Sequence, residues 1–131
     1  MSAALTFDNF AFSYQAAAEA ELLAERFAAQ PNQDGRPLIG PLCTEIEEGS
    51  FTLITGATGC GKTTLLRCCK PELAPNGIHT GAVKIFGKDS STLSVEESAS
   101  TVGFVMQNPD NQLVCSEPWH ELAFGLENLA V

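Results

Sequence analysis

The chain has 131 residues, 44% of them hydrophobic, which is enough for one compact domain or for part of a larger one. Its 16 Asp and Glu residues outnumber its 7 Lys and Arg residues, so the formal net charge is −9. Domains that bind nucleic acid are usually basic, because phosphate neutralisation supplies much of their affinity, and the charge therefore argues against a nucleic-acid partner.

The cysteines and the apolar runs indicate the compartment. The five cysteines are odd in number and form no C-x-x-C pair, which argues against a disulfide framework or a metal site and suits a reducing cytosol. The first residues show no basic stretch followed by an apolar one, so we expect no signal peptide. No apolar run approaches the roughly 20 residues that span a bilayer, so we expect any membrane association to be peripheral.

The chain opens with a predicted strand over residues 5–14. Alternation puts Phe7 on one face and Phe10 on the other, and Phe12 and Tyr14 follow. A tyrosine at the end of a strand is either partly buried packing or a flat surface on which a purine ring can stack.

An alanine-rich insert and a second strand come next. Residues 16–29 predict a short surface helix, and residues 30–37 predict a loop because they contain Pro and Gly. Neither segment contains residues that indicate a catalytic or binding role. Residues 38–46 predict a strand with Leu42, Thr44 and Ile46 on one side.

A glycine-rich octet at residues 56–63 is the most informative stretch. It fits G-x-x-x-x-G-K-[ST] at every fixed position. Residues 50–55 before it predict a buried, parallel strand, and residues 63–69 after it predict a helix that Pro71 brings to an end. Strand, glycine loop and helix is the setting in which this motif binds phosphate.

The residue types explain this chemistry. Glycines let consecutive N–H groups turn inward around an anion, and the following helix directs its free N–H groups to the same place. Lys62 can reach terminal phosphates, and the Thr63 hydroxyl can ligate Mg²⁺. Cys60 is either a small loop residue or a thiol activated by the helix N-terminus. The alternative for the whole motif is a glycine-rich turn with a surface lysine.

The second half of the chain alternates strand and helix patterns. Residues 81–87 predict a strand with Val83 and Ile85 on one face. Ser94 and Glu97 have the spacing of a capping box, and residues 101–106 predict a buried strand. Gln107 follows this strand directly, at the carboxyl edge where open α/β sheets bind ligands.

A last helix is predicted over residues 117–129. Ser116 is its expected N-cap, and Pro118 is tolerated in its first turn. Apolar residues recur at near-helical spacing and favour a core or partner contact over a cofactor site; they are Trp119, Leu122, Ala123, Leu126 and Leu129.

Four stretches together resemble the N-terminal half of an ATP-binding-cassette (ABC) transporter ATPase. They are residues 10–14, 56–64 (the Walker A loop of that family), 81–87 and 102–113. The string Gln107-Asn108-Pro109-Asp110-Asn111-Gln112 looks like the Q-loop of the energy-coupling-factor group, the cobalt and vitamin importers. The resemblance implies an α/β fold: a P-loop NTPase (RecA-like) core with an antiparallel β-subdomain, truncated before the Walker B strand.

The resemblance also implies site residues, with ATP and Mg²⁺ as cofactors. Lys62 and Gln107 would be catalytic, and Thr63 and Gln107 would complete the Mg²⁺ shell. The residues expected to hold the nucleotide are Tyr14, Gly56, Ala57, Thr58, Gly59, Cys60, Gly61, Lys62, Thr63 and Thr64.

The domains and partners follow from the same resemblance. Residues 1–114 would form the ATP-binding core and β-subdomain, with 15–37 inserted, and residues 115–131 would begin the helical subdomain. The complete protein would hydrolyse ATP to drive uptake of a vitamin or a metal ion such as cobalt, on the inner face of the membrane. It would work with a second ABC ATPase subunit and an integral membrane subunit.

The family's signature motif, its Walker B aspartate with the catalytic glutamate, and its switch histidine would lie beyond Val131. We therefore expect these 131 residues alone to hydrolyse ATP hardly or not at all, and to self-associate through an exposed sheet edge. A soluble ABC-family ATPase and a non-catalytic nucleotide-binding module are the alternative functions.

Overall fold

The structure is a computed structural model that describes residues 2–14 and 38–129. These residues fall into two units, Met1–Leu93 and Ser94–Val131, and each is described by itself. The helix and loop predicted over residues 16–37 lie outside the described residues. The boundary predicted between an ATP-binding core (residues 1–114) and a helical subdomain (residues 115–131) does not coincide with the boundary between these units, and it stays a prediction.

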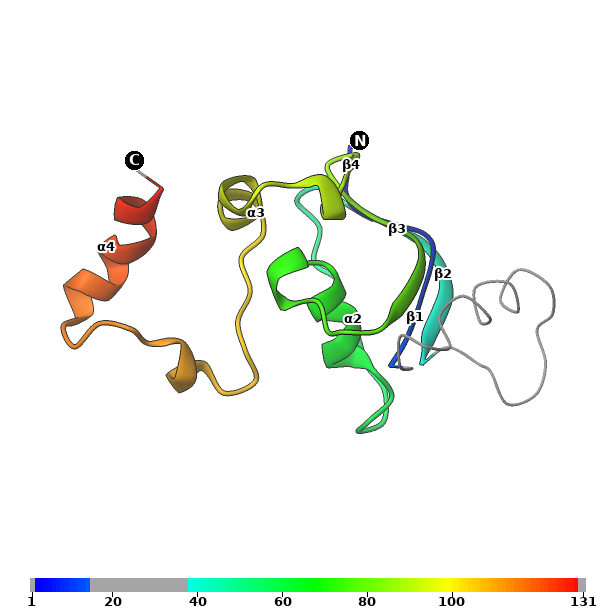
Figure 1. The fold of residues 1–131 in the computed structure, drawn as a ribbon, viewed down its shortest axis with the longest axis horizontal. Helices are drawn as coiled ribbons and strands as arrows, with labels where there is room; N and C mark the ends of the chain where they lie inside the picture. The colour runs from blue at the N-terminus through cyan, green and yellow to red at the C-terminus, as the bar shows by residue number, and fades with distance from the viewer. Residues whose placement is uncertain (1, 15–37, 130–131) are drawn as a thin grey trace. The chain divides into compact units, whose positions relative to one another are not determined.

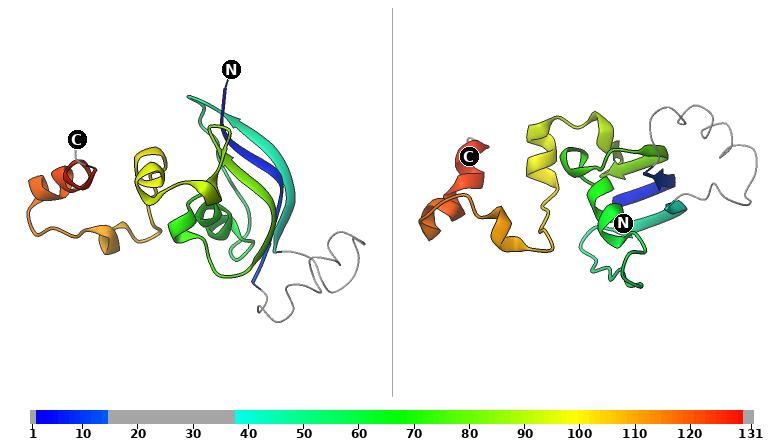
Figure 2. Two further views of the ribbon diagram at one scale, coloured as in Figure 1. Left: turned by 45° about the horizontal axis from the view of Figure 1, so that its top comes forward. Right: turned by 60° about the horizontal axis from the view of Figure 1, so that its bottom comes forward.

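The first unit is built on a four-stranded antiparallel sheet in the order β2-β1-β3-β4. The strands are β1 (Ala3–Ser13), β2 (Ile39–Glu47), β3 (Ile78–Ile85) and the short β4 (Lys88–Asp89). The helix α2 (Lys62–Cys68) lies on the concave side of this curved sheet (Figures 1 and 2). Two 3₁₀ turns, η2 (Pro71–Leu73) and η3 (Ser90–Thr92), complete the unit.

A bulge in β1 decides which side chains form the core. Asp8 pairs with Ala82 and Ala11 with Thr80, so two residues of β1 lie opposite Gly81 alone. The extra residue reverses the alternation, and Phe7 and Phe10 are both buried. The predicted placement of Phe7 and Phe10 on opposite faces is therefore wrong.

The rest of the core comes from the neighbouring elements. Val83 and Ile85 are buried on one face of β3, as predicted, and Phe86 is exposed at its end. Phe12 is the largest fully buried side chain of the described residues. Cys68 on α2 and Ile39 on β2 are buried as well.

Residues 50–55 do not form the buried parallel strand that their composition predicts. They belong to no helix or strand, and Phe51 and Leu53 are 91% and 74% exposed. A strand requires a hydrogen-bonded neighbour, and no other segment within 2–14 and 38–129 supplies one. The predicted edge strand is therefore absent, its apolar residues Phe51 and Leu53 are exposed, and the self-association expected through that edge stays a prediction.

The second unit contains three short helical elements joined by extended chain. They are α3 (Val95–Thr101), the 3₁₀ turn η4 (Pro109–Gln112) and α4 (Pro118–Asn128). The predicted capping box of Ser94 and Glu97 is confirmed, with both hydrogen bonds present at the start of α3. Residues 102–106 are extended but are not the predicted strand, because no described strand pairs with them.

The last helix begins one residue later than predicted. Pro118 takes the first helical position, for which its fixed φ is suited, so Glu117 and not Ser116 is the N-cap. The apolar residues of α4 form no core among the described residues: Trp119, Leu122 and Leu126 are 62%, 82% and 56% exposed. None of the helices in the described part of the chain is long and apolar enough to cross a membrane.

Candidate nucleotide site

The glycine loop leads directly into α2, as the octet predicts. Gly59 and Gly61 have φ values of 83° and 99°, in the left-handed region where glycine is favoured. Gly61 is the N-cap of α2, and no described side chain caps the helix there. The first N–H groups of a helix have no intrahelical partner, so the start of α2 offers donors to an anion.

Lys62 lies folded back over the loop. Its Nζ donates to the carbonyl oxygens of Gly56 and Ala57, each at 2.8 Å, and lies 3.6 Å from Sγ of Cys60. The ammonium group is therefore held by the first two residues of the preceding loop. The loop is tightened further by a bond from the Cys60 N–H to the Ala57 carbonyl, at 3.2 Å.

Two threonines follow Lys62 and differ in their surroundings. Thr63 is exposed at the start of α2, while Thr64 is buried. The hydroxyl groups of Thr64 and Tyr14 are hydrogen-bonded at 2.9 Å, although the residues are 50 positions apart in the chain. Tyr14 is 55% exposed, and its ring makes a T-shaped contact with the ring of Phe12, with 4.9 Å between the centroids.

This bond between Tyr14 and Thr64 brings an aromatic ring to α2, the helix that follows the glycine loop. The sequence indicates each residue separately, but only the register of β1 and the position of α2 bring them together. Tyr14 remains 55% exposed in this packing. The loop, the ammonium group and the aromatic ring are thus collected in one unit of the structure.

The residue types fit a nucleotide with its phosphates. Backbone N–H groups, an ammonium group and threonine hydroxyls are donors for phosphate oxygens, and a hydroxyl oxygen can also ligate Mg²⁺. A Cβ at Gly59 would meet nothing within 4 Å, so the loop is open at this glycine. No group of three or more His, Cys, Asp or Glu residues in the described chain could hold a metal ion by itself.

Gln107, the other predicted metal ligand, belongs to the second unit, where it is exposed just after the extended segment 102–106. Thr63 belongs to the first unit, and the joint role of the two residues stays a prediction. A residue that the sequence analysis missed lies nearby: the side chain of Gln112 hydrogen-bonds to the backbone on either side of Val105.

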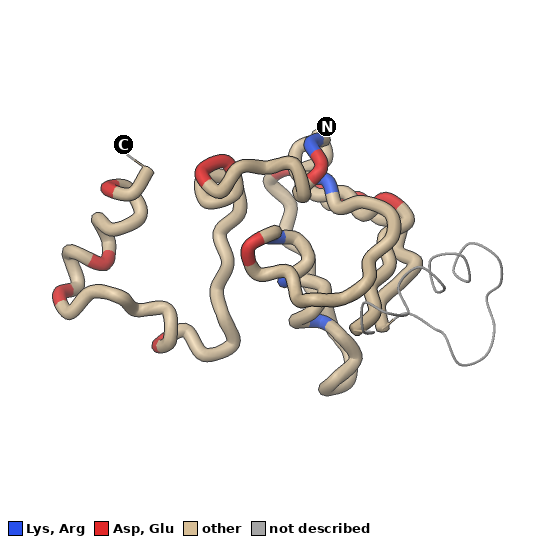
Figure 3. The backbone as a smooth tube through the Cα atoms, viewed as in Figure 1, with Lys and Arg blue, Asp and Glu red and all other residues tan. Residues whose placement is uncertain are grey.

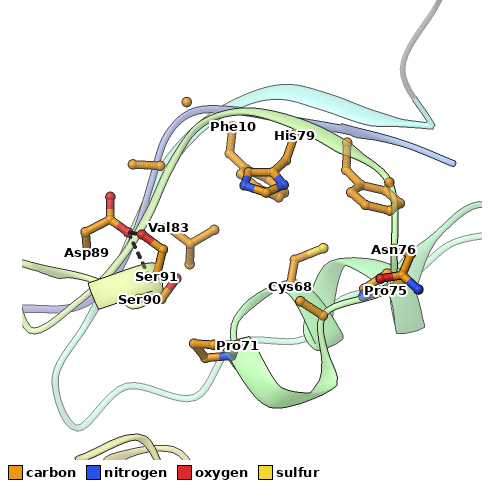
Figure 4. Close-up of a pocket in the computed structure, with 15 residues that line it drawn as sticks. Phe10, Cys68, Pro71, Pro75, Asn76, His79, Val83, Asp89, Ser90 and Ser91 are labelled. Atoms are coloured by element: carbon orange, nitrogen blue, oxygen red, sulfur yellow. Dashed lines mark hydrogen bonds between the residues drawn. The ribbon is translucent and has the colours of Figure 1, made fainter. Parts of the chain in front are cut away.

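A cavity of about 400 Å³ lies in the first unit at a different place from the glycine loop. Phe10, His79 and Val83 of the sheet point into it, and Cys68 of α2 faces them (Figure 4). Asp89 lines one end, where the N–H and hydroxyl groups of Ser91 donate to its carboxylate and hold its pKa below the ordinary value. None of residues 56–63 lines the cavity, so it takes no part in the candidate site.

Cys68 in α2 and Cys69 at its C-cap differ from the thiol of the loop. Burial raises the pKa of the Cys68 thiol to about 11 and that of Cys69 to about 12. Cys60 in the loop is exposed. The two buried thiols therefore act as apolar packing at neutral pH.

Comparison with known families identifies the family of the chain. Residues 40–121 match a family model described as ABC transporter. The chain belongs to the ABC transporter family. Membership implies the P-loop NTPase fold, of which the described residues show an antiparallel sheet with helices.

Several curated ABC proteins are similar to the chain. A putative ABC transporter ATP-binding protein of Methanosarcina mazei is 36% identical over 132 residues, covering 98% of this chain and 19% of that protein. One of Methanosarcina acetivorans is 38% identical over 97 residues, covering 72% of this chain and 15% of that protein.

The third relative is the energy-coupling factor transporter ATP-binding protein EcfA1 of Lactobacillus delbrueckii subsp. bulgaricus. It is 38% identical over 96 residues, covering 73% of this chain and 34% of that protein. The chain thus spans between about a seventh and a third of the length of these relatives. No solved structure matches the chain.

Proposed function

We propose that the chain is an ATP-binding part of an ABC-type importer, and that residues 56–64 hold the phosphates of ATP. The observation that carries this proposal is the position of Lys62. Its Nζ lies against the loop carbonyls of Gly56 and Ala57, from which a short side-chain rotation brings it to an anion in the loop. The left-handed Gly59 and Gly61 allow the loop its turn, and the family match supplies the ligand class.

Tyr14 is the proposed contact for the adenine ring. Its hydrogen bond to Thr64 ties the ring to the helix that would carry the phosphates. The ring packs against the buried Phe12, and Tyr14 as a residue is 55% exposed. An exposed ring held by a rigid neighbour suits stacking on a purine.

Mg²⁺ would be held by the Thr63 hydroxyl, with Gln107 as a second ligand. This assignment follows the family resemblance of the Gln107 segment, and the exposure of both side chains supports it. Bound Mg²⁺ would neutralise charge on the phosphate oxygens. The complete protein would hydrolyse ATP, with Lys62 and Gln107 among the catalytic residues.

The partners would be a second ABC ATPase subunit and an integral membrane subunit, with the assembly on the cytoplasmic face of the membrane. The similarity to EcfA1 supports an importer, whose cargo would be a vitamin or a metal ion such as cobalt. The surface of α4 supports a membrane-protein partner, because Trp119, Leu122 and Leu126 are exposed there together with acidic residues (Figure 3). An apolar and acidic helix fits a partner segment that is apolar and basic.

Calorimetric titration of the purified chain with ATP and Mg²⁺ tests the proposal. We expect Lys62→Ala to lower the affinity roughly tenfold or more, because it removes a charge-assisted hydrogen bond to phosphate. Lys70→Ala is the matched control, since it removes the same charge from the other end of the helix, where Lys70 contacts Glu72 at 3.8 Å. Equal affinity of the Lys62 variant and the unsubstituted chain would refute the proposed site.

A further inference from the structure

The side chain of Gln112 hydrogen-bonds to the extended segment 102–106 in the place where a neighbouring strand would pair with it. The Oε1 atom of Gln112 accepts a hydrogen bond from the N–H of Met106 at 2.6 Å, and its Nε2 donates to the carbonyl oxygen of Phe104 at 2.9 Å. In extended chain these two backbone groups flank Val105 and point to the same side. The amide of Gln112 thus pairs with the segment as the backbone of an adjacent strand would.

Only a side-chain amide of this length satisfies both bonds. Glutamine carries one acceptor and one donor at its tip, whereas a carboxylate has acceptors only and would face the Phe104 carbonyl without a proton. Both bonds are partly shielded from water, and Gln112 itself is half-buried. A lost partner in such a place costs more than one in open solvent.

The chain that follows Gln112 is also held by hydrogen bonds. The Oε2 atom of Glu121 in α4 accepts hydrogen bonds from the N–H groups of Val114 and Cys115, at 3.0 and 2.7 Å. These two donors hold the pKa of the Glu121 carboxyl below its ordinary value. Residues 107–113 between the two anchors contain the 3₁₀ turn η4, so Gln112 leaves a short, fixed turn rather than a free loop.

We propose that Gln112 is a positioning residue for Gln107. The Met106 amide that Gln112 holds immediately precedes Gln107, so the clamp fixes the point from which Gln107 leaves the extended segment. The inference rests on the proposed function, in which Gln107 helps to hold Mg²⁺ with the nucleotide. Gln112 itself touches neither ligand; it acts through the backbone of residues 104–106.

The clamp is tested first by amide hydrogen exchange, measured by NMR on the unsubstituted chain. We expect the Met106 amide to exchange about tenfold more slowly than that of Val105, which points away from Gln112. Gln112→Glu replaces the donor by a carboxylate oxygen that faces the Phe104 carbonyl oxygen at almost constant size; we expect the repulsion between these two acceptors to displace the side chain from both bonds and to abolish most of this protection. Asn111→Asp is the control, because it makes the same amide-to-acid change at an exposed neighbour. Equal exchange of Met106 in the two variants overturns the clamp.

The positioning role is tested by the gain in ATP affinity that Mg²⁺ produces. We expect Gln112→Glu to reduce this gain about as much as Gln107→Ala does, and to have no further effect when Gln107 is already alanine. Additive losses would show that Gln112 acts independently of Gln107 and would overturn the proposal. If the unsubstituted chain binds no ATP, the proposed function and the role of both glutamines fail, while slow exchange at Met106 would still establish the clamp.

Discussion

The bulge in β1 makes Gly81 the most constrained glycine of the sheet, and its replacement is a sharp test of the fold. Gly81 has a φ of 71°, and a Cβ on it would overlap the carbonyl oxygens of Asp8 and Asn9 in the facing strand. An L-residue in the left-handed region costs about 1–2 kcal/mol. Forcing atoms into a packed place costs roughly another 1–3 kcal/mol. We therefore expect Gly81→Ala to lower the free energy of unfolding by about 2–5 kcal/mol.

Gly87 separates the two contributions. It has a similar φ of 79°, but a Cβ there would meet nothing within 4 Å. Gly87→Ala should cost only the conformational part, about 1–2 kcal/mol. Urea unfolding followed by far-UV circular dichroism gives both values by linear extrapolation. Trp119 is less useful as a probe, because it is the single tryptophan and lies in the other unit.

The difference between the two variants is the decisive quantity. A larger loss for Gly81→Ala, by about 1–3 kcal/mol, would confirm that β1 approaches β3 most closely at the bulge. Equal losses would mean that the strands do not meet there as described, and that Phe7 and Phe10 do not share one face. Since Tyr14 directly follows the last residue of β1, the Gly81 variant should also bind ATP more weakly, and the Gly87 variant should not.

Two further predictions concern titration in the first unit. Burial raises the pKa values of Cys68 and Cys69 to about 11 and 12, so we expect both thiols to react with iodoacetamide at pH 8 far more slowly than the exposed Cys60. Mass spectrometry of peptides measures the three rates, and equal rates would contradict the burial of Cys68 and Cys69. The folded-state pKa of Asp89 lies below 3.8 because Ser91 donates two hydrogen bonds to it, so its contribution to stability is present above that pH and is lost as the pH falls through the folded-state value. Asp89→Asn should therefore flatten the fall in stability below pH 4, and an unchanged pH profile of urea unfolding would refute this.

The features that the sequence predicts correctly depend on neighbours in the chain. The capping box needs only Ser94 and Glu97, three residues apart, and the helix after the glycine loop needs only its own residues. The alternation that buries Val83 and Ile85 is likewise local. Each of these follows from spacing, so a single sequence is enough to predict it.

The features that the sequence misses depend on distant partners. An apolar run such as residues 50–55 is compatible with a buried strand, but a strand exists only where another segment accepts its hydrogen bonds. The bulge at Asn9 has no signal in β1 alone; the matching signal is Gly81, some 70 residues later, which can approach a facing backbone closely. The Tyr14–Thr64 bond needs both the strand and the helix in place.

The Gln107 string combines both kinds of information. Its residue types point to the Q-loop resemblance, and Pro109 predicts the turn that η4 forms. Gln112, the sixth residue of the string, hydrogen-bonds to the preceding segment 102–106, and the spacing of residues does not predict this contact. A glutamine at the end of a turn that follows an apolar run is the pattern that would have indicated it.

The charges of the two units fit different kinds of partner. All five Lys and Arg residues of the described chain lie in the first unit, whereas residues 94–131 contain six acidic residues and no basic one (Figure 3). An anionic nucleotide is therefore favoured at the glycine loop, where Lys62 and Arg67 lie on α2, and is disfavoured along α4. Because the acidic residues of α4 stand beside exposed apolar ones, a partner there must bring both positive charge and apolar surface. Added salt would then weaken that association through its charged part alone and leave the apolar part in place.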